Sequence, residues 1–198
     1  MNKIAAILFF LLASGNGLAD ETIAFIRHGE KPENGLGQLN CQGLNRSLAL
    51  PDNLIGKFGK PDAIFAPNPA LLKKDHGTSY AYIRPLATIE PTAIRLGLPV
   101  NLQFGYKNSE ALRATLLSPS YKNAMIFVSW EHHWAQKIVQ GLVASIDKNE
   151  AKKVPVWQDD DFDSIYVVRI TGEGTEKRVT FSLDKQGLNG LPDNCAVH

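Results

Sequence analysis

The sequence predicts a single-domain α/β protein. Runs of β-branched and aromatic residues at 22–27, 62–66 and 125–129 are each followed, directly or after a loop, by a segment with helical spacing. Two more strand-like runs, at 162–170 and 177–183, flank the turn sequence TGEGTE and predict a β-hairpin. With 198 residues, 44% of them hydrophobic, and no internal repeat, the chain can bury one full core.

The N-terminus has the pattern of a secretory signal peptide. Lys3 supplies the charged start, an apolar run extends from Ile4 to Ala13, and small residues lead to Ala19. We therefore expect residues 1–19 to be a signal peptide, cleaved before Asp20, and residues 20–198 to form the mature domain. This start predicts a secreted, periplasmic protein, and no second apolar run is long enough to anchor the chain in a membrane.

The first half of the mature chain begins with a buried strand that starts at Thr22 and ends at Arg27 and His28. After a loop rich in glycine and asparagine, residues 41–58 follow helical spacing, with Leu44, Leu48 and Leu54 on the apolar face and an interruption at Pro51. A short strand follows at 62–66. The segment 67–82 is polar and long for a connection, which predicts a loop over a functional site.

The second half repeats the alternation of helix and strand. Helices are predicted at 87–96, which glycine and proline terminate, and at 108–117, with Asn108 or Ser109 as the N-cap. A buried strand at 125–129 precedes an amphipathic helix at 134–146, and the turn between them contains Glu131, His132 and His133. The predicted hairpin completes the chain.

Polar side chains follow two of the predicted strands at the point where each ends. Arg27 and His28 follow the first strand, and His132 follows the strand at 125–129. In open α/β sheets, ligands bind beyond the carboxyl ends of the strands. The fold can therefore bring these residues, more than a hundred positions apart, into one crevice.

The overall charge excludes some classes of partner. A formal net charge of +1 gives no reason to expect binding to nucleic acid or to an anionic membrane surface. Any function of the arginines must therefore be local.

Cys41 and Cys195 are the only cysteines. In an oxidising compartment they could form one disulfide, although two separate buried thiols are equally compatible with the sequence. No CxxC or Cys/His spacing indicates zinc.

Three motifs in the right order resemble the histidine phosphatase superfamily, which contains the phosphoglycerate mutases and many phosphomonoesterases. The tetrapeptide RHGE at 27–30 resembles the signature of that family, and RPLATIEPTA from Arg84 resembles its second phosphate-binding arginine and the following helix. FVSWEHH at 127–133 resembles the strand that delivers the second histidine. The segment LNCQGLNRSLAL from Leu39 resembles the helix that comes after the first motif in the family. The resemblance covers most of the mature chain.

The resemblance implies a three-layer α/β/α sandwich with a mostly parallel sheet, of the phosphoglycerate mutase-like type. It implies that His28 is the nucleophile that forms a phosphohistidine and that His132 stabilises the transferring phosphoryl group. Arg27 and Arg84 would bind the substrate phosphate, since the guanidinium fork matches phosphate oxygens. No metal and no other cofactor is expected, and the implied partner is a small phosphorylated substrate.

Two residues depart from the pattern of the family. His133 stands where members usually carry a small residue, and matching Glu131-His132 to members with Trp-Glu-His favours His132 as the second histidine. His133 is then expected to be an exposed turn residue. Lys31 would either add charge to the phosphate pocket or be a solvated lysine.

The proton donor for the leaving group stays open at the level of sequence. Family members often place a carboxyl group between the second arginine and the second histidine. Glu110 lies in that interval, but it is equally explained as a first-turn helix residue, and Glu131 is the other candidate. The segment 100–105, where many members carry a glutamate, has none. The acidic run at 159–161 is expected to be a solvated loop.

Two functions of other classes compete with a phosphomonoesterase. A zinc hydrolase could use Glu131, His28, His132 and His133, but adjacent histidines rarely bind one ion, no HExxH motif is present, and Arg27 would repel the metal. A catalytically inactive binder of phosphorylated ligands would keep the pocket without turnover. The sequence predicts an exported phosphomonoesterase, for which sugar phosphates, phosphorylated glycans and other organic monoesters are candidate substrates.

Overall fold

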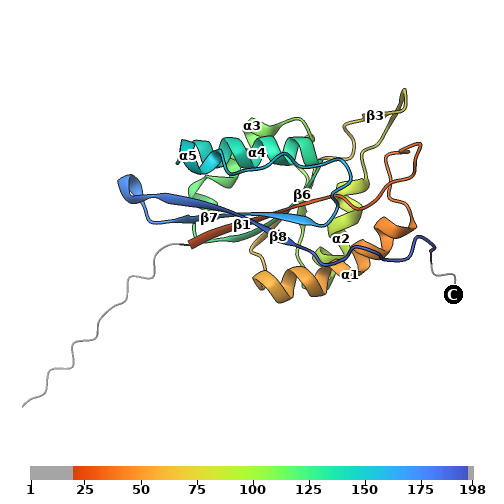
Figure 1. Ribbon diagram of the computed structural model, residues 1–198, viewed down its shortest axis with the longest axis horizontal. Coiled ribbons are helices and arrows are strands. Elements are labelled where there is room, and N and C mark those ends of the chain that lie inside the picture. The colour runs from red at the N-terminus through yellow and green to blue at the C-terminus, as the bar shows by residue number, and fades with distance from the viewer. Residues whose placement is uncertain (1–19, 196–198) are drawn as a thin grey trace, which may run out of the picture.

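The computed structural model describes residues 20–195, so the predicted signal peptide lies outside the described residues. The elements follow one another in the order below, and Figure 1 shows their arrangement. They are β1 (Asp20–Arg27), α1 (Cys41–Phe58), β2 (Ala63–Phe65), β3 (Lys73–Asp75), β4 (Thr78–Tyr80), α2 (Arg84–Leu96), β5 (Val100–Asn101), α3 (Ser109–Leu116), η1 (Pro119–Tyr121), β6 (Met125–Trp130), α4 (His132–Ala144), α5 (Lys148–Ala151), β7 (Ser164–Thr171), η2 (Gly174–Glu176) and β8 (Arg178–Lys185).

A six-stranded sheet in the order β5-β2-β6-β1-β7-β8 forms the centre of the molecule. Four neighbouring strands, β5, β2, β6 and β1, are parallel to one another. Strand β7 is antiparallel to β1, and β8 is antiparallel to β7. The parallel strands come from the βα units and the antiparallel pair from the predicted hairpin. The mostly parallel sheet is therefore confirmed.

Helices cover both faces of this sheet (Figure 1). Alternate residues of β1 face opposite layers: Ile23 and Phe25 pack with α3, α4 and α5, whereas Ala24 and Ile26 pack with α1 and α2. Both layers bury apolar side chains against the sheet, which gives two cores around one sheet. This is the predicted three-layer α/β/α sandwich.

Helix α1 differs from its prediction in two ways. It continues through Pro51, because Leu50, Pro51 and Leu54 are all buried and this packing holds the two halves in line. Its buried face also lies elsewhere: Leu44 and Leu48 are exposed, and the inward positions include Arg46. A buried arginine is tolerated there because buried carboxylates surround it, as described below.

Helices α2 and α4 begin earlier than predicted. Helix α2 starts at Arg84 rather than residue 87, since Pro85 is compatible with a first helical turn. Helix α4 starts at His132 rather than residue 134, because the side chain of Glu131 caps it by accepting from the Trp134 amide at 3.0 Å. Both changes place predicted site residues in the first turn of a helix.

The cysteines form a disulfide between Cys41 and Cys195. This bond fixes the C-terminal segment against the start of α1, where the side chains of Gln42 and Asn45 also donate to carbonyls of residues 191–194. Of the two possibilities that the sequence left open, the structure has the disulfide. Among the described residues, no helix combines the length and the apolar content needed to cross a membrane.

Candidate active site

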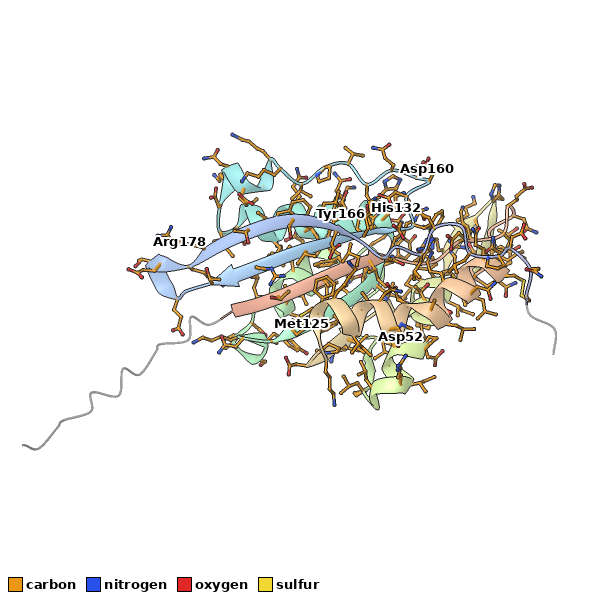
Figure 2. The ribbon with its side chains drawn as sticks, turned by 60° about the horizontal axis from the view of Figure 1, so that its bottom comes forward. Asp52, Met125, His132, Asp160, Tyr166 and Arg178 are labelled. Atoms are coloured by element: carbon orange, nitrogen blue, oxygen red, sulfur yellow. A yellow bond between two sulfur atoms is a disulfide. The ribbon has the colours of Figure 1, made fainter. Side chains whose placement is uncertain are left out.

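The predicted site residues meet at the carboxyl ends of β1 and β6. These strands are parallel neighbours in which Arg27 is in register with Trp130, and the amide of His28 donates to the Trp130 carbonyl at 3.1 Å. His28 and His132 therefore follow adjacent strands at the same edge. Figure 2 shows His132, the first residue of α4, near Asp160, and Met125, the first residue of β6, apart from both.

A cavity of about 320 Å³ opens at this edge. One part of its wall consists of Arg27, His28, Lys31, Lys73, Asp75 and Arg84. The remainder consists of Glu131, His132, His133 and Asp159. The cavity thus collects all four predicted site residues, His28, His132, Arg27 and Arg84, together with further charged groups.

His28 is held in one orientation by the backbone that follows it. Its Nδ1 lies 2.7 Å from the carbonyl oxygen of Gly29, which can only accept, so Nδ1 carries the proton and Nε2 keeps its lone pair. Burial lowers the pKa of His28 well below its ordinary value of 6.5, and Arg84 and Arg27 lower it further. The side chain is therefore a neutral imidazole with a free nucleophilic nitrogen at neutral pH.

Gly29 is required for this close packing. A Cβ on Gly29 would lie 2.9 Å from the carbonyl oxygen of Gly43 in α1. The Gly29 amide donates to Thr88 Oγ1 in α2 at 2.8 Å. The loop that carries His28 is therefore fixed against both helices of one layer.

Glu30 completes the RHGE sequence but serves the structure rather than the cavity. It accepts from Nε and Nη2 of Arg46 at 2.6–3.1 Å, and Arg46 also donates to Asp163 at 3.4 Å and to Gln186 at 3.0 Å. This buried network joins the loop after β1 to α1 and to the segment after β8. The RHGE motif thus contains two residues that line the cavity, Arg27 and His28, and one that stabilises the fold, Glu30.

Arg27 is buried and tied at one end of its guanidinium group. Nη1 donates to the carbonyls of Gln158, Asp159 and Asp161, at 3.3, 2.6 and 3.3 Å, and the guanidinium stacks on the ring of Phe162 at 3.8 Å. Nε is buried and has no hydrogen-bond partner within residues 20–195. One end of the side chain is anchored while a donor stays available.

Arg84, like Arg27, is anchored at one end of its guanidinium group. Nη1 donates to Asp75 Oδ2 at 2.6 Å and to the Gly35 carbonyl at 3.1 Å, and Nη2 lies 3.4 Å from Asp75 Oδ1. Nε again has no partner in the described part of the chain. Two buried arginine Nε groups therefore remain unpaired around one cavity.

His132 stands between two carboxylates. Its Nε2 lies 2.7 Å from Asp159 Oδ1, which can only accept, so Nε2 carries a proton. Its Nδ1 lies 3.1 Å from Glu131 Oε1 but makes no hydrogen bond to any described residue. Burial alone would raise the pKa of Glu131, but His132 and Lys73 lower it to about 2, so Glu131 is ionised.

The loop prediction for residues 67–82 is consistent with the structure. This segment contains the β3–β4 hairpin, which brings Lys73 and Asp75 to the cavity wall. Lys73 Nζ lies 3.7 Å from Glu131 Oε1 and over the rings of Tyr82 and Tyr106. Neither Lys73 nor Asp75 was predicted as a site residue, although the long polar insertion pointed to their segment.

The structure decides between the two interpretations of Glu110. It is a first-turn residue of α3 whose side chain is 77% exposed, pairs with Arg113 and does not line the cavity, so it is not positioned to donate a proton there. The run 159–161 is a loop in which Asp159 and Asp160 are exposed, as expected. Asp159 contacts His132, and Asp161 caps the start of β7 by accepting from the amides of Asp163 and Ser164.

The two residues that depart from the family pattern both line the cavity. His133 is exposed as expected, with 56% of its side chain accessible, and its Nε2 lies 3.4 Å from Asp159 Oδ1. Lys31 is exposed at the rim.

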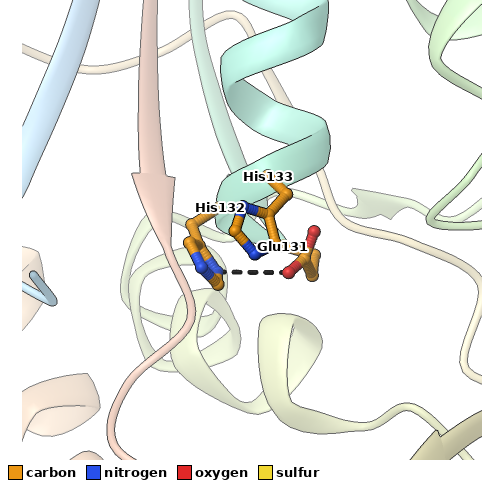
Figure 3. A group of neighbouring side chains, drawn as sticks. All are labelled: Glu131, His132 and His133. Atoms are coloured by element: carbon orange, nitrogen blue, oxygen red, sulfur yellow. Dashed lines mark ion pairs between the residues drawn. The ribbon is translucent and has the colours of Figure 1, made fainter. Parts of the chain in front are cut away.

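The side chains that could hold a metal include only part of the predicted zinc set. Glu131, His132 and His133 have potential ligand atoms within 4.8 Å of one another (Figure 3). His28 is not a member of this group. The donors therefore do not form the four-residue centre that a zinc hydrolase would need.

Comparisons with known proteins establish the fold. No protein-family profile and no curated protein matches the sequence. Among solved structures, mycobacterial hydrolase 2 is similar to this chain, with a TM-score of 0.55 and 14% sequence identity. The match covers 84% of this chain and 90% of the hydrolase chain.

Two solved phosphatases are also similar. The putative phosphohistidine phosphatase SixA from Agrobacterium tumefaciens has a TM-score of 0.52 and 13% identity, over 82% of this chain and 97% of its own. A mycobacterial glucosyl-3-phosphoglycerate phosphatase has a TM-score of 0.51 and 13% identity, over 89% of this chain and 100% of its own. These likenesses confirm the phosphoglycerate mutase-like fold and agree with the resemblance to histidine phosphatases.

Proposed function

We propose that the protein is a phosphomonoesterase that acts through a phosphohistidine on His28. The observation that carries the proposal is a pair of buried donors with no hydrogen-bond partner in residues 20–195, Nε of Arg27 and Nε of Arg84, on two side chains that line the cavity. Unpaired buried donors are costly, and an acceptor-only dianion such as a phosphate ester would satisfy them.

The reaction follows from these positions. With the phosphate on the two arginines, Nε2 of His28 forms a bond to phosphorus while the bond to the ester oxygen breaks and its electrons leave with that oxygen. The arginines and His132 stabilise the negative charge on the three transferring oxygens. The leaving oxygen takes a proton from solvent. Water then attacks phosphorus and gives up a proton to solvent while the N–P bond breaks and its electrons return to Nε2.

The neighbouring folds support this class of reaction. Two of the similar structures are phosphatases by name, and one structure of the mycobacterial enzyme is a complex with inorganic phosphate, with a TM-score of 0.51 and 15% identity. The four predicted site residues line one cavity in this chain. The substrate is a small organic phosphate monoester, and the site supplies the positive charge without a metal.

We also propose that the chain is exported and begins at Asp20 in its mature form. The signal-like start and the Cys41–Cys195 disulfide support this, since disulfides persist in oxidising compartments. Intact-mass measurement of protein from a cell envelope fraction tests it. Retention of residues 1–19 would argue against export.

A panel of phosphate monoesters, assayed with and without EDTA, tests the function. We expect hydrolysis of at least one monoester, resistance to EDTA and inhibition by vanadate. Binding of phosphate without turnover of any ester would favour the inactive binder. Activity that EDTA abolishes and zinc restores would favour the metal hydrolase.

A further inference from the structure

Two adjacent histidines at the start of α4 lie side by side rather than diverging. The ring centroids of His132 and His133 are 4.0 Å apart, and the rings are inclined by 35° (Figure 3). Asp159 lies against both, with Oδ1 2.7 Å from His132 Nε2 and 3.4 Å from His133 Nε2. Two imidazole nitrogens and a carboxylate oxygen therefore converge on one point.

These spacings suit a first-row transition metal. Zinc binds nitrogen and oxygen at about 2.0–2.2 Å, which places two ligands of a tetrahedral ion about 3.3–3.6 Å apart. The 3.4 Å between His133 Nε2 and Asp159 Oδ1 fits that spacing, whereas the 2.7 Å between His132 Nε2 and Asp159 Oδ1 would have to lengthen. The ion would replace the proton that His132 Nε2 shares with Asp159, whereas Glu131 lies 3.1 Å from the other ring nitrogen of His132, Nδ1.

The point is open to solvent. The side chain of Asp159 is 83% exposed and that of His133 is 56% exposed. An ion can enter without displacing the core, and small movements of two exposed side chains complete its shell. Adjacent histidines rarely bind one ion, but here both rings lie beside the same carboxylate.

We propose that His132, His133 and Asp159 bind a transition-metal ion such as Zn²⁺, and that this ion inhibits the enzyme. The inhibitory part rests on the proposed function, in which His132 stabilises the transferring phosphoryl group. A metal on His132 removes that imidazole from the reaction and blocks the cavity beside it. The neighbouring cations Arg27 and Lys73 and the positive end of α4 weaken the site, so binding is reversible.

The test uses untagged full-length mature protein and His133, which takes no part in the proposed reaction. Zinc chloride is titrated by calorimetry, and Co²⁺ is used as a probe whose visible absorption reports tetrahedral coordination. The variants are His133→Asn and, as a matched control, His76→Asn, which changes another exposed histidine that does not line the cavity.

We expect one zinc ion per chain in the wild type and the control. Loss of even an outer-shell partner commonly weakens metal binding by 10–100-fold, so His133→Asn should weaken it by about tenfold or more. The same variant should resist zinc inhibition, measured relative to its own activity without zinc. Equal zinc affinity in His133→Asn and wild type, or no stoichiometric binding, overturns the site.

Other outcomes separate this inference from the proposed function. Zinc that binds through His133 without inhibiting overturns the inhibitory role, as does activity that requires zinc. A protein that binds zinc through His133 but hydrolyses no phosphate ester supports the metal site and overturns the phosphatase. An active enzyme that does not bind zinc overturns the metal site alone.

Discussion

Asp75 and Arg84 form a buried ion pair at the cavity wall, in which Oδ2 of Asp75 lies 2.6 Å from Nη1 of Arg84. Asp75 also accepts from the Gly37 amide at 3.1 Å. The carboxylate therefore fixes the guanidinium group against the loop after β1, and the Nε edge stays unpaired.

This pair gives a prediction with a definite sign. By charge alone, removal of Asp75 would strengthen the binding of an anion. If the carboxylate positions Arg84, Asp75→Asn should instead raise KM and the inhibition constant of phosphate by about tenfold, the size of one lost charge-assisted contact, with a smaller effect on kcat. Steady-state kinetics measures both. Asp184→Asn, which removes an exposed carboxylate paired with Lys57, is the control, and tighter phosphate binding in Asp75→Asn would refute the positioning role.

The pKa of His28 determines the acid side of the pH profile. Burial, Arg84 and Arg27 lower it, so protonation of the free enzyme, and loss of kcat/KM through it, occurs well below pH 6.5. Arg84→Gln removes one of these cations and should move the acid limb to higher pH, whereas Arg84→Lys keeps the charge and should move it less. Profiles of kcat/KM with one substrate for all three proteins test this. An unmoved limb in Arg84→Gln would mean that another group controls it.

Glu131 is not the proton donor in its present environment. A carboxyl group with a pKa of about 2 is ionised at neutral pH and cannot protonate the leaving oxygen. Glu131→Gln should therefore slow the hydrolysis of an alkyl phosphate and of p-nitrophenyl phosphate by similar factors. The comparison is decisive because only the alkyl ester needs an acid. A much larger loss with the alkyl ester would make Glu131 the acid.

Glu21 lies away from the active site and predicts a pH-dependent stability. Burial raises its pKa from 4.5 to about 7, although Lys177 partly opposes this, and its Oε1 has no hydrogen-bond partner within the described chain. The folded protein then holds a proton that the unfolded chain loses, so stability falls as pH rises from about 4.5 through 7.

Glu21→Gln should remove this loss. We compare the free energy of unfolding of the variant with that of the wild type at each pH. This difference should favour the variant by on the order of 1 kcal/mol more at pH 8 than at pH 5, allowing for partial solvent screening. Urea unfolding at the two pH values, with the disulfide intact, measures the difference. Glu173→Gln serves as the exposed control, and an equal effect of Glu21→Gln at both pH values would contradict the burial argument.

The sequence was sufficient to predict five of the six strands of the central sheet, but not the two-residue edge strand β5. Because β1 and β6 are continuous apolar runs, they were predicted, and their parallel register brings His28 beside His132. The hairpin at 73–80 was not predicted, because its three-residue strands are polar and have no hydrophobic periodicity. Asp159 could not be assigned because its contact with His132 spans 27 residues and depends on the loop that anchors Arg27. The inward face of α1 was predicted wrongly because hydrophobic spacing considers only apolar residues such as the leucines. Arg46 is buried because carboxylates pair with it, and these partners lie far away in the sequence.

The identity of the covalent intermediate tests the mechanism most directly. Wild-type protein mixed with a phosphate-labelled substrate and quenched in the steady state should carry an acid-labile, base-stable phosphoryl group, located by peptide mass spectrometry on the segment that contains His28. His28→Ala should lack the label and lose about a thousandfold or more in kcat, while it still binds inorganic phosphate through Arg27 and Arg84. A label on another residue, or near-normal turnover in His28→Ala, would contradict the phosphohistidine mechanism.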